Sequence, residues 1–274
     1  AAGTTITATQ WSSLFNRVSE ILQHQGSSTS LVNPTVGDTI QAFSALNTDI
    51  QNLFNNRLNA AASGTDITSG GSVSGTTSWY TQAQTTTTIT FGSAAQARYY
   101  FNAGGIIRIT PIRSGTNNQK SSSWNTFASN VGTIAFTNGS PSTIAGTTYS
   151  GTDKLGGSGT PSILASNTGF YDLTPGGSST TIFKQFLCND YDYDTNFIQL
   201  DVSLNSASTA LTFTMTFRDD AADEKTDALG NPLTQDQVQG TTGSSLVARQ
   251  PSTTYISNTW GTPSISGSIS YITS

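Results

Sequence analysis

The chain has 274 residues but only one cysteine, Cys188, and only one histidine, His24. A single cysteine excludes an intrachain disulfide and a multi-cysteine zinc site. A single histidine excludes paired histidine zinc ligands and leaves one imidazole as a general base. His24 ends a helical pattern, and a cationic side chain is favourable at a helix C-terminus, so we expect a structural role for it. These shortages predict a non-enzymatic protein that needs no cofactor.

Charged residues are also scarce. Lys, Arg, Asp and Glu make up 10% of the chain, and the formal net charge is −5 at pH 7. An acidic chain without a basic stripe lacks the electrostatic footprint of a nucleic-acid-binding protein. No run of apolar residues is long enough to span a bilayer. We therefore expect neither nucleic acid nor membrane among the partners.

Threonine, serine and glycine take the place of the missing charges. The chain also holds 13 Phe, 9 Tyr and 4 Trp, which can fill a core. Disordered chains combine low hydrophobicity with high net charge, and the net charge here is small. Because β-branched threonine suits a pleated strand and tolerates water, the composition predicts sheets with one solvated face.

The first sixty residues follow a helical period instead. Two apolar stripes with the same spacing are present, and they consist of Trp11, Leu14, Val18, Ile21 and Leu22 and of Phe43, Leu46, Ile50, Leu53 and Phe54. Capping-box pairs precede both stripes, Thr7 with Gln10 and Asp38 with Gln41. We expect residues 1–60 to form an αα-hairpin that serves docking and assembly. The predicted assembly interface is Trp11, Leu14, Val18, Phe43, Leu46 and Ile50.

Beyond the hairpin the apolar period changes to two. Residues 61–78 are rich in Gly, Ser and Thr and are predicted to be a linker. Residues 79–274 alternate apolar and polar positions in several segments, most clearly in 197–204 and 211–218. Short helices are expected at 93–101 and 123–130. The predicted fold is therefore mainly β with a helical N-terminus: an antiparallel β-sandwich with two short helices, preceded by the αα-hairpin.

One acidic segment has the spacing of a calcium-binding loop. Its five oxygen ligands would be Asp190, Asp192, Asp194, Asn196 and Asp201, at positions 1, 3, 5, 7 and 12 of an EF-hand loop. Thr195 stands where the loop turn requires glycine, and no helices flank the segment. A solvated turn is the alternative. A second acidic cluster begins at Asp219 and is predicted to be a solvated loop.

Three aromatic residues are candidates for a binding surface. Trp79, Tyr80 and Trp260 are amphipathic side chains of the kind found at protein and sugar interfaces. The alternative is that they fill the sandwich core.

Four segments resemble virion structural proteins of large tailed bacteriophages of the cyanophage myovirus type. They are ITATQWSSL (6–14), ARYYFNAGGIIR (97–108), GFYDLT (169–174) and FRDD (217–220). The resemblance implies a non-enzymatic, tail-associated virion structural protein. The leading hypothesis is a tail fibre, fibre-adaptor or baseplate-peripheral subunit. The alternatives are a capsid or tail decoration protein and a receptor- or glycan-binding module. Its partners would be other virion proteins, further copies of itself and a host surface glycan.

Overall fold

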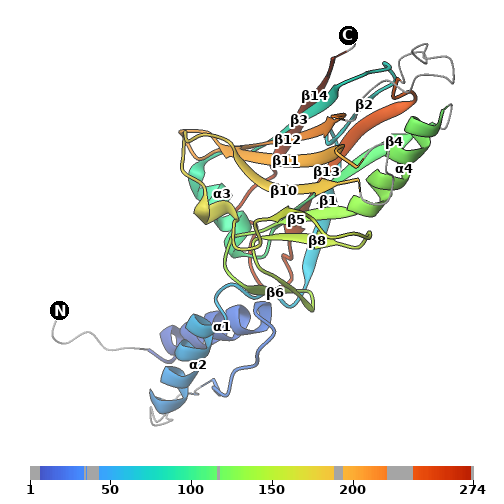
Figure 1. Cartoon of the computed structure of the whole chain (residues 1–274). Helices are drawn as coiled ribbons and strands as arrows, with labels where there is room; N and C mark the ends of the chain where they lie inside the picture. Colours follow the sequence, from blue (N-terminus) through green and yellow to red (C-terminus); the bar gives the residue numbers. More distant parts are fainter. Residues whose placement is uncertain are drawn as a thin grey trace, which may run out of the picture.

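The computed structural model describes residues 7–33, 35, 43–115, 118–187, 194–220 and 237–272. Two helices at the N-terminal end extend away from a body made of β-sheets (Figure 1). The body consists of antiparallel sheets in a sandwich-like arrangement, with two further α-helices beside them. The prediction of a mainly β fold with a helical N-terminus is confirmed.

The first helix begins where its capping box predicts. α1 (Ala8–His24) starts after Thr7, whose backbone N–H donates to Gln10 Oε1 at 2.9 Å. The Gln10 backbone N–H donates in return to Thr7 Oγ1 at 3.3 Å, so two otherwise unpaired helix donors are satisfied. The second helix is α2 (Phe43–Asn55). Its expected capping pair, Asp38 and Gln41, lies outside the described residues.

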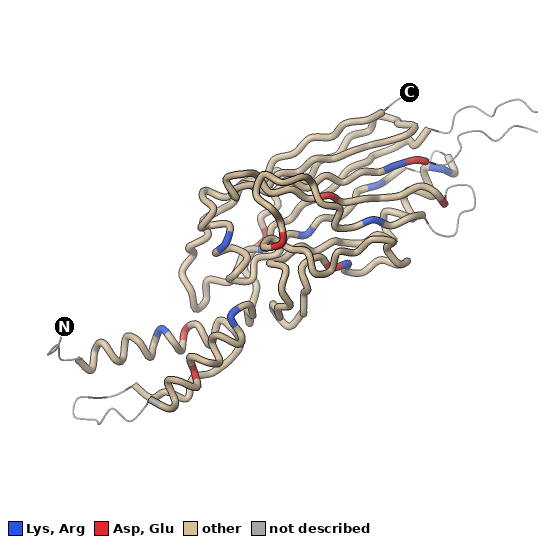
Figure 2. Tube along the Cα trace, turned by 60° about the vertical axis from the view of Figure 1, so that its left-hand side comes forward, with Lys and Arg blue, Asp and Glu red and all other residues tan. Residues whose placement is uncertain are grey.

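The two helices run in the same direction, which differs from the antiparallel hairpin expected from the sequence. Gln25 Nε2, just beyond the end of α1, donates to the Leu53 carbonyl near the end of α2 at 3.2 Å. Both C-terminal ends therefore point towards the β body (Figures 1 and 2). The length of the connector permits this arrangement. α1 is about 25 Å long, which roughly eight extended residues can span, so residues 25–42 suffice to return to its start.

The connector packs along one side of both helices on its way back. Asn33 Nδ2 donates to Asn16 Oδ1 at 3.0 Å, half-way along α1. Thr29 Oγ1 donates to Asp49 Oδ2 on α2 at 2.5 Å. We call α1, α2 and the described part of this connector the helical pair.

The body contains two six-stranded sheets. In the first sheet the strands are ordered β1-β13-β4-β5-β8, and β2 also pairs with β13. Its strands are β1 (Ser63–Ile67), β2 (Ser72–Gly75), β4 (Ile106–Ser114), β5 (Thr133–Phe136), β8 (Thr152–Leu155) and β13 (Thr241–Pro251). The second sheet has the order β14-β3-β12-β11-β10-β9. Its strands are β3 (Gln82–Thr90), β9 (Ile163–Leu164), β10 (Thr180–Phe186), β11 (Phe197–Leu204), β12 (Ala210–Arg218) and β14 (Ser264–Ile272).

Smaller elements complete the body. The expected short helices are present as α3 (Ala94–Asn102), capped by Ser93, and α4 (Gln119–Val131), capped by Asn118. A hairpin of β6 (Ser142–Ile144) and β7 (Thr147–Tyr149) forms a separate two-stranded sheet. A 3-10 turn follows at η1 (Phe170–Asp172).

The segment predicted to be a linker is part of the body instead. Residues 61–78 contain β1 and β2, and both strands pair antiparallel with β13. Glycine is needed in this segment for close approach rather than for flexibility, because a Cβ on Gly71 would lie 1.9 Å from the Leu246 carbonyl oxygen. Composition alone does not separate such a strand from a linker, since the small side chains are the same in both.

The core lies between the sheets and alternates as the sequence predicts. Ile198, Leu200 and Val202 on β11 are fully buried, and the inward face of β12 is buried in the same way. Threonine is used inside the sandwich as well as outside. Thr85 on β3 and Ser244 on β13 are both buried, with their hydroxyl oxygens 2.6 Å apart. This pairing satisfies two buried hydroxyls at once and explains how a threonine-rich chain builds an interior.

Candidate functional site

The helical pair joins the body through a small junction. Two backbone bonds link Ala60 to the β6–β7 hairpin: its N–H donates to Thr143 O and its carbonyl accepts from Ala145 N, each at 2.9 Å. The Ala61 N–H donates to the His24 carbonyl at 2.6 Å. The helices thus meet the sheets at their C-terminal ends and project from there (Figure 2).

His24 is the side chain that ties α1 to the body. Its Nε2 lies 3.2 Å from the Ala103 carbonyl at the end of α3, so this nitrogen carries the hydrogen and donates. The ring is 6% exposed, and burial lowers the pKa of His24 below its usual 6.5, against a smaller opposing effect of the bond to Ala103. His24 therefore acts as a neutral hydrogen-bond donor to Ala103, and not as the helix-terminal cation expected from the sequence.

The predicted assembly residues divide into a buried and an exposed set. Val18 is buried within the helical pair, while Trp11 and Leu46 are half-buried. Leu14 and Ile50 are 42% and 46% exposed. The side chain of Phe43 lies outside the described residues.

The sequence prediction missed one buried residue of α1 and left two exposed apolar residues out of the assembly interface. Phe15 is 4% exposed and packs against Trp11 with 5.7 Å between ring centroids, yet it is absent from the predicted stripe. It lies four residues after Trp11 and three before Val18, so the helical period could have found it. Ile21 and Phe54 belonged to the stripes but not to the predicted interface, and they are 40% and 61% exposed.

Four of these exposed residues lie on one side of the helical pair. The buried line of α1 runs through Phe15, Val18 and Leu22. At about 100° per residue, Leu14 and Ile21 lie roughly 70–95° to one side of this line. Ile50 and Phe54 lie roughly 40–80° to the other side of the line through Leu46 on α2. In helices that run in the same direction, opposite offsets fall on the same side. We call Leu14, Ile21, Ile50 and Phe54 the exposed apolar flank.

The connector covers the other side of the helical pair. Its two anchors, Asn16 and Asp49, have angular offsets opposite in sign to those of the flank. The flank is therefore the side of the helical pair opposite the connector.

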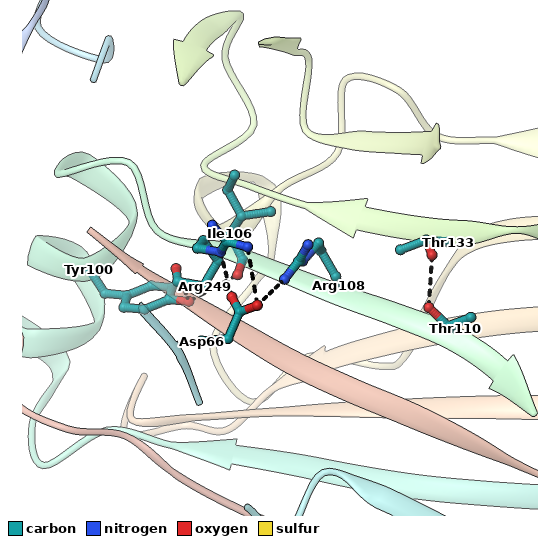
Figure 3. Close-up of polar contacts among 7 residues, drawn as sticks. All are labelled: Asp66, Tyr100, Ile106, Arg108, Thr110, Thr133 and Arg249. Carbon is teal, nitrogen blue, oxygen red and sulfur yellow. Dashed lines mark hydrogen bonds and ion pairs between the residues drawn. The ribbon is translucent and has the colours of Figure 1, made fainter. Parts of the chain in front are cut away.

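A charged cluster links three strands of the first sheet (Figure 3). Asp66 on β1 accepts from Arg108 Nη2 on β4 at 2.7 Å and from Arg249 Nη2 on β13 at 3.1 Å, and it also pairs with Arg249 Nε. The three side chains are each about one-third exposed. Ion pairs this exposed contribute little to stability. Their main consequence is geometric, because the Asp66 carboxylate on β1 bonds to side chains of both β4 and β13.

A cavity of about 190 Å³ adjoins this cluster, lined in part by Arg108, Arg249 and Tyr149. Two guanidinium groups against one carboxylate give it a net positive charge. Beneath them the buried hydroxyl of Tyr100 lies 3.0 Å from the Ile106 carbonyl and 2.9 Å from the Arg249 carbonyl. Burial, the largest cause, together with the Asp66 charge raises the pKa of Tyr100, so this hydroxyl stays a neutral donor. The cavity can hold a small anion but presents no nucleophile with an adjacent base.

Of the five predicted calcium ligands only three lie in the described part of the chain, so the complete site stays a prediction. Asp201 lies on β11, where it accepts from Thr181 Oγ1 at 2.5 Å and from Gln199 Nε2 at 2.9 Å. Asn196 is fully buried, and its Oδ1 accepts from the Asp220 N–H at 2.9 Å. Asp194 is exposed, while Asp190 and Asp192 lie outside the described residues. The described portion of the chain contains no cluster of His, Cys, Asp or Glu that could hold a metal ion.

The second acidic cluster also begins differently from the prediction. Asp219 is 4% exposed and pairs with Lys120 Nζ on α4 at 2.7 Å, so it is a buried ion-pair partner rather than a solvated loop residue. The residues that follow Asp220 in this cluster lie outside the described ranges.

The predicted binding aromatics belong to the interior. Trp79 is 0% and Trp260 1% exposed, so neither can contact a surface ligand. Trp79 Nε1 donates to Thr242 Oγ1 at 2.9 Å, and its ring lies edge-on to Trp124 with 5.2 Å between centroids. Tyr80 is half-buried, and its hydroxyl accepts from Gln237 Nε2. The core alternative is the correct one for both tryptophans.

Comparison with protein-family models, curated protein sequences and solved structures finds no match for the chain. Among the helices that the structure describes, none is both long enough and apolar enough to cross a membrane.

Proposed function

We propose that the chain is a non-enzymatic structural subunit of a tailed-bacteriophage virion, placed in the tail as a fibre, fibre-adaptor or baseplate-peripheral protein. The observation that carries the proposal is the exposed apolar flank on a helical pair that projects from a β-sandwich. Apolar side chains gathered on one side of a projecting element are typical of interaction sites. The resemblance of four sequence segments to virion structural proteins adds the biological setting.

The size of the flank sets the binding free energy that docking could provide. Fully burying a large aliphatic or aromatic side chain is worth about 1.5–3 kcal/mol, and the flank residues are already about half-buried. Covering all four therefore yields about 4 kcal/mol, near the lower end of the cost of association. One such contact is weak, whereas two or more copies linked in one oligomer would bind a repetitive surface more tightly through avidity. A repetitive virion supplies that multiplicity.

The test compares incorporation of variants into particles. Leu14→Asp combined with Ile50→Asp places two charges on the flank without touching the buried line, so the sandwich stays folded and the virion copy number falls. Val32→Asp is the matched control, since Val32 is 83% exposed and belongs to the connector side. Quantitative mass spectrometry of purified particles gives the copy number. Full incorporation of the double variant would contradict docking through the flank, and absence of the wild-type chain from particles would contradict the virion role.

Copy number also separates the two structural alternatives. A number close to that of the capsid or tail-tube subunits identifies a decoration protein, and a much smaller number identifies a fibre or adaptor. A cryo-EM map of the same particles locates the subunit.

A further inference from the structure

The edges of the two sheets are protected unequally. β9 is only two residues long, and β2 only four. β8 carries Asp153 and Lys154, while β1 carries Asp66 and a register irregularity. Short length, charge and irregular pairing are the usual means of preventing edge-to-edge association. β14 has none of them, because its nine residues, SISGSISYI, include no charge and no proline and pair regularly with β3.

The backbone of β14 presents unpaired groups on its outer side. The Ile272 carbonyl accepts from the Tyr80 N–H at 3.2 Å, so it points towards the β3 side of the strand. Since N–H and C=O groups alternate in direction along a strand, those of Ile265, Gly267, Ile269 and Tyr271 point away from β3. β14 is also the outermost strand of its sheet (Figure 1).

The turn between β1 and β2 covers one end of this edge. A Cβ on Gly70 would lie 2.1 Å from the Ile265 carbonyl oxygen, so the turn lies directly against that group. No hydrogen bond among the described residues reaches the outward groups of Gly267, Ile269 and Tyr271. These three residues form the open part of the edge.

The open part is self-complementary. The tripeptide Ser268-Ile269-Ser270 reads the same in both directions, and antiparallel pairing sets one copy against the reverse of the other. A two-fold axis at Ile269 places Ser268 opposite Ser270 of a second copy and Gly267 opposite its Tyr271. The exposed serines stay on the solvent face, because a two-fold axis normal to the sheet preserves both faces.

From these observations we propose that β14 pairs antiparallel with β14 of a second copy of this chain, through Gly267–Tyr271. The β14-containing sheets of the two subunits then form one continuous sheet across a two-fold axis. The interface is isologous, as in most homodimers, and its affinity comes from main-chain hydrogen bonds between strands. This proposal is independent of the virion role and of the exposed apolar flank.

The test measures the mass of the full-length chain in solution over a range of concentrations. Size-exclusion chromatography with light scattering, supported by sedimentation equilibrium, is expected to show a dimer of the 28.7 kDa chain. Ser268→Lys with Ser270→Lys sets like charges opposite each other at both ends of the pairing. Because both serines are exposed, the fold is unaffected, and the dimer dissociation constant rises about tenfold or more.

Two controls make the outcome specific. Ser203→Lys introduces the same change on the outer face of β11, in the interior of the same sheet, and leaves the dimer intact. The flank variant Leu14→Asp with Ile50→Asp also leaves it intact. A monomeric wild-type chain, a dimer unaffected by the paired lysines, or a dimer lost in the flank variant would each overturn the proposal. Circular dichroism and thermal unfolding verify that every variant is folded.

Discussion

Lys120 and Asp219 form an ion pair that is almost entirely removed from water, and its burial indicates how much stability is lost when one partner is removed. Lys120 lies in the first turn of α4, and Asp219 directly follows β12. Their charged atoms are 2.7 Å apart, and the two side chains are 1% and 0% exposed. Replacing Lys120 by methionine keeps an unbranched side chain of similar length and removes the ammonium group.

The expected cost is large because the carboxylate of Asp219 is left behind in the interior. Removing one partner of a buried ion pair costs about 3–5 kcal/mol. A domain of this size loses roughly 2–4 °C of melting temperature per kcal/mol, so the expected decrease is on the order of 10 °C. In Lys120→Met combined with Asp219→Leu neither charge remains. The double variant is therefore expected to be about as stable as the wild type, or more stable.

Urea unfolding followed by tryptophan fluorescence measures the free energy of unfolding of the three proteins. Arg17→Met is the matched control: Arg17 and Glu20 are 2.8 Å apart, but their side chains are 77% and 43% exposed. Its cost should stay well under 1 kcal/mol, because exposed pairs are screened by water. If Lys120→Met and Arg17→Met cost the same, burial does not determine the strength of these pairs and the reasoning fails. A double variant no more stable than the single one would also refute it.

Two further predictions concern pH. The pKa of Tyr100 is raised from 10.0 in the folded state, so the unfolded chain loses this proton first as pH rises. The free energy of unfolding therefore falls above about pH 10, by up to ~1.4 kcal/mol per pH unit. Tyr100→Phe should lower the free energy of unfolding by about 1–3 kcal/mol at pH 7, because a buried carbonyl loses its hydrogen-bond donor. Urea titrations at alkaline pH should show a shallower fall of stability in this variant than in the wild type. Equal slopes in the two proteins would contradict the raised pKa of Tyr100. For His24 the folded pKa is lowered, so the undocked state takes up a proton first and the junction weakens as pH falls below about 6.5. Hydrogen exchange at the Ala61 amide, corrected for its intrinsic rate, should be faster at pH 5 in the wild type. It should not accelerate in His24→Gln, because glutamine keeps a hydrogen-bond donor but does not titrate. An equal acceleration in both proteins would contradict the role of His24.

The strand predictions succeeded where side-chain alternation reports on burial directly. In β11 and β12 every second residue is apolar and buried, so period and environment agree. The same reasoning found α1 from its capping box and apolar stripe. It failed at 61–78, where Ser, Gly and Thr fit both a linker and a closely packed strand, and only the pairing of β1 and β2 with β13 decides between them.

The candidate site was only partly accessible from sequence. The helical period identified Leu14 and Ile50 but gave no means of choosing which side of each helix meets the other. That choice depends on the direction of α2, which the connector determines by running back along α1. The binding role of Trp79 and Trp260 failed for a related reason, since an amphipathic aromatic suits a core and an interface equally well until its neighbours are known.

The sequence alone determined the fold class of this protein. Abundant threonine and segments in which apolar and polar residues alternate predict a β-rich body, because both are local properties of the chain. Tertiary structure alone decided which groups are exposed, which charges are buried and which strand lies at an open edge. Those properties depend on residues far apart in sequence, such as Lys120 with Asp219 or Asp66 with Arg249, and no local pattern encodes the distance between them.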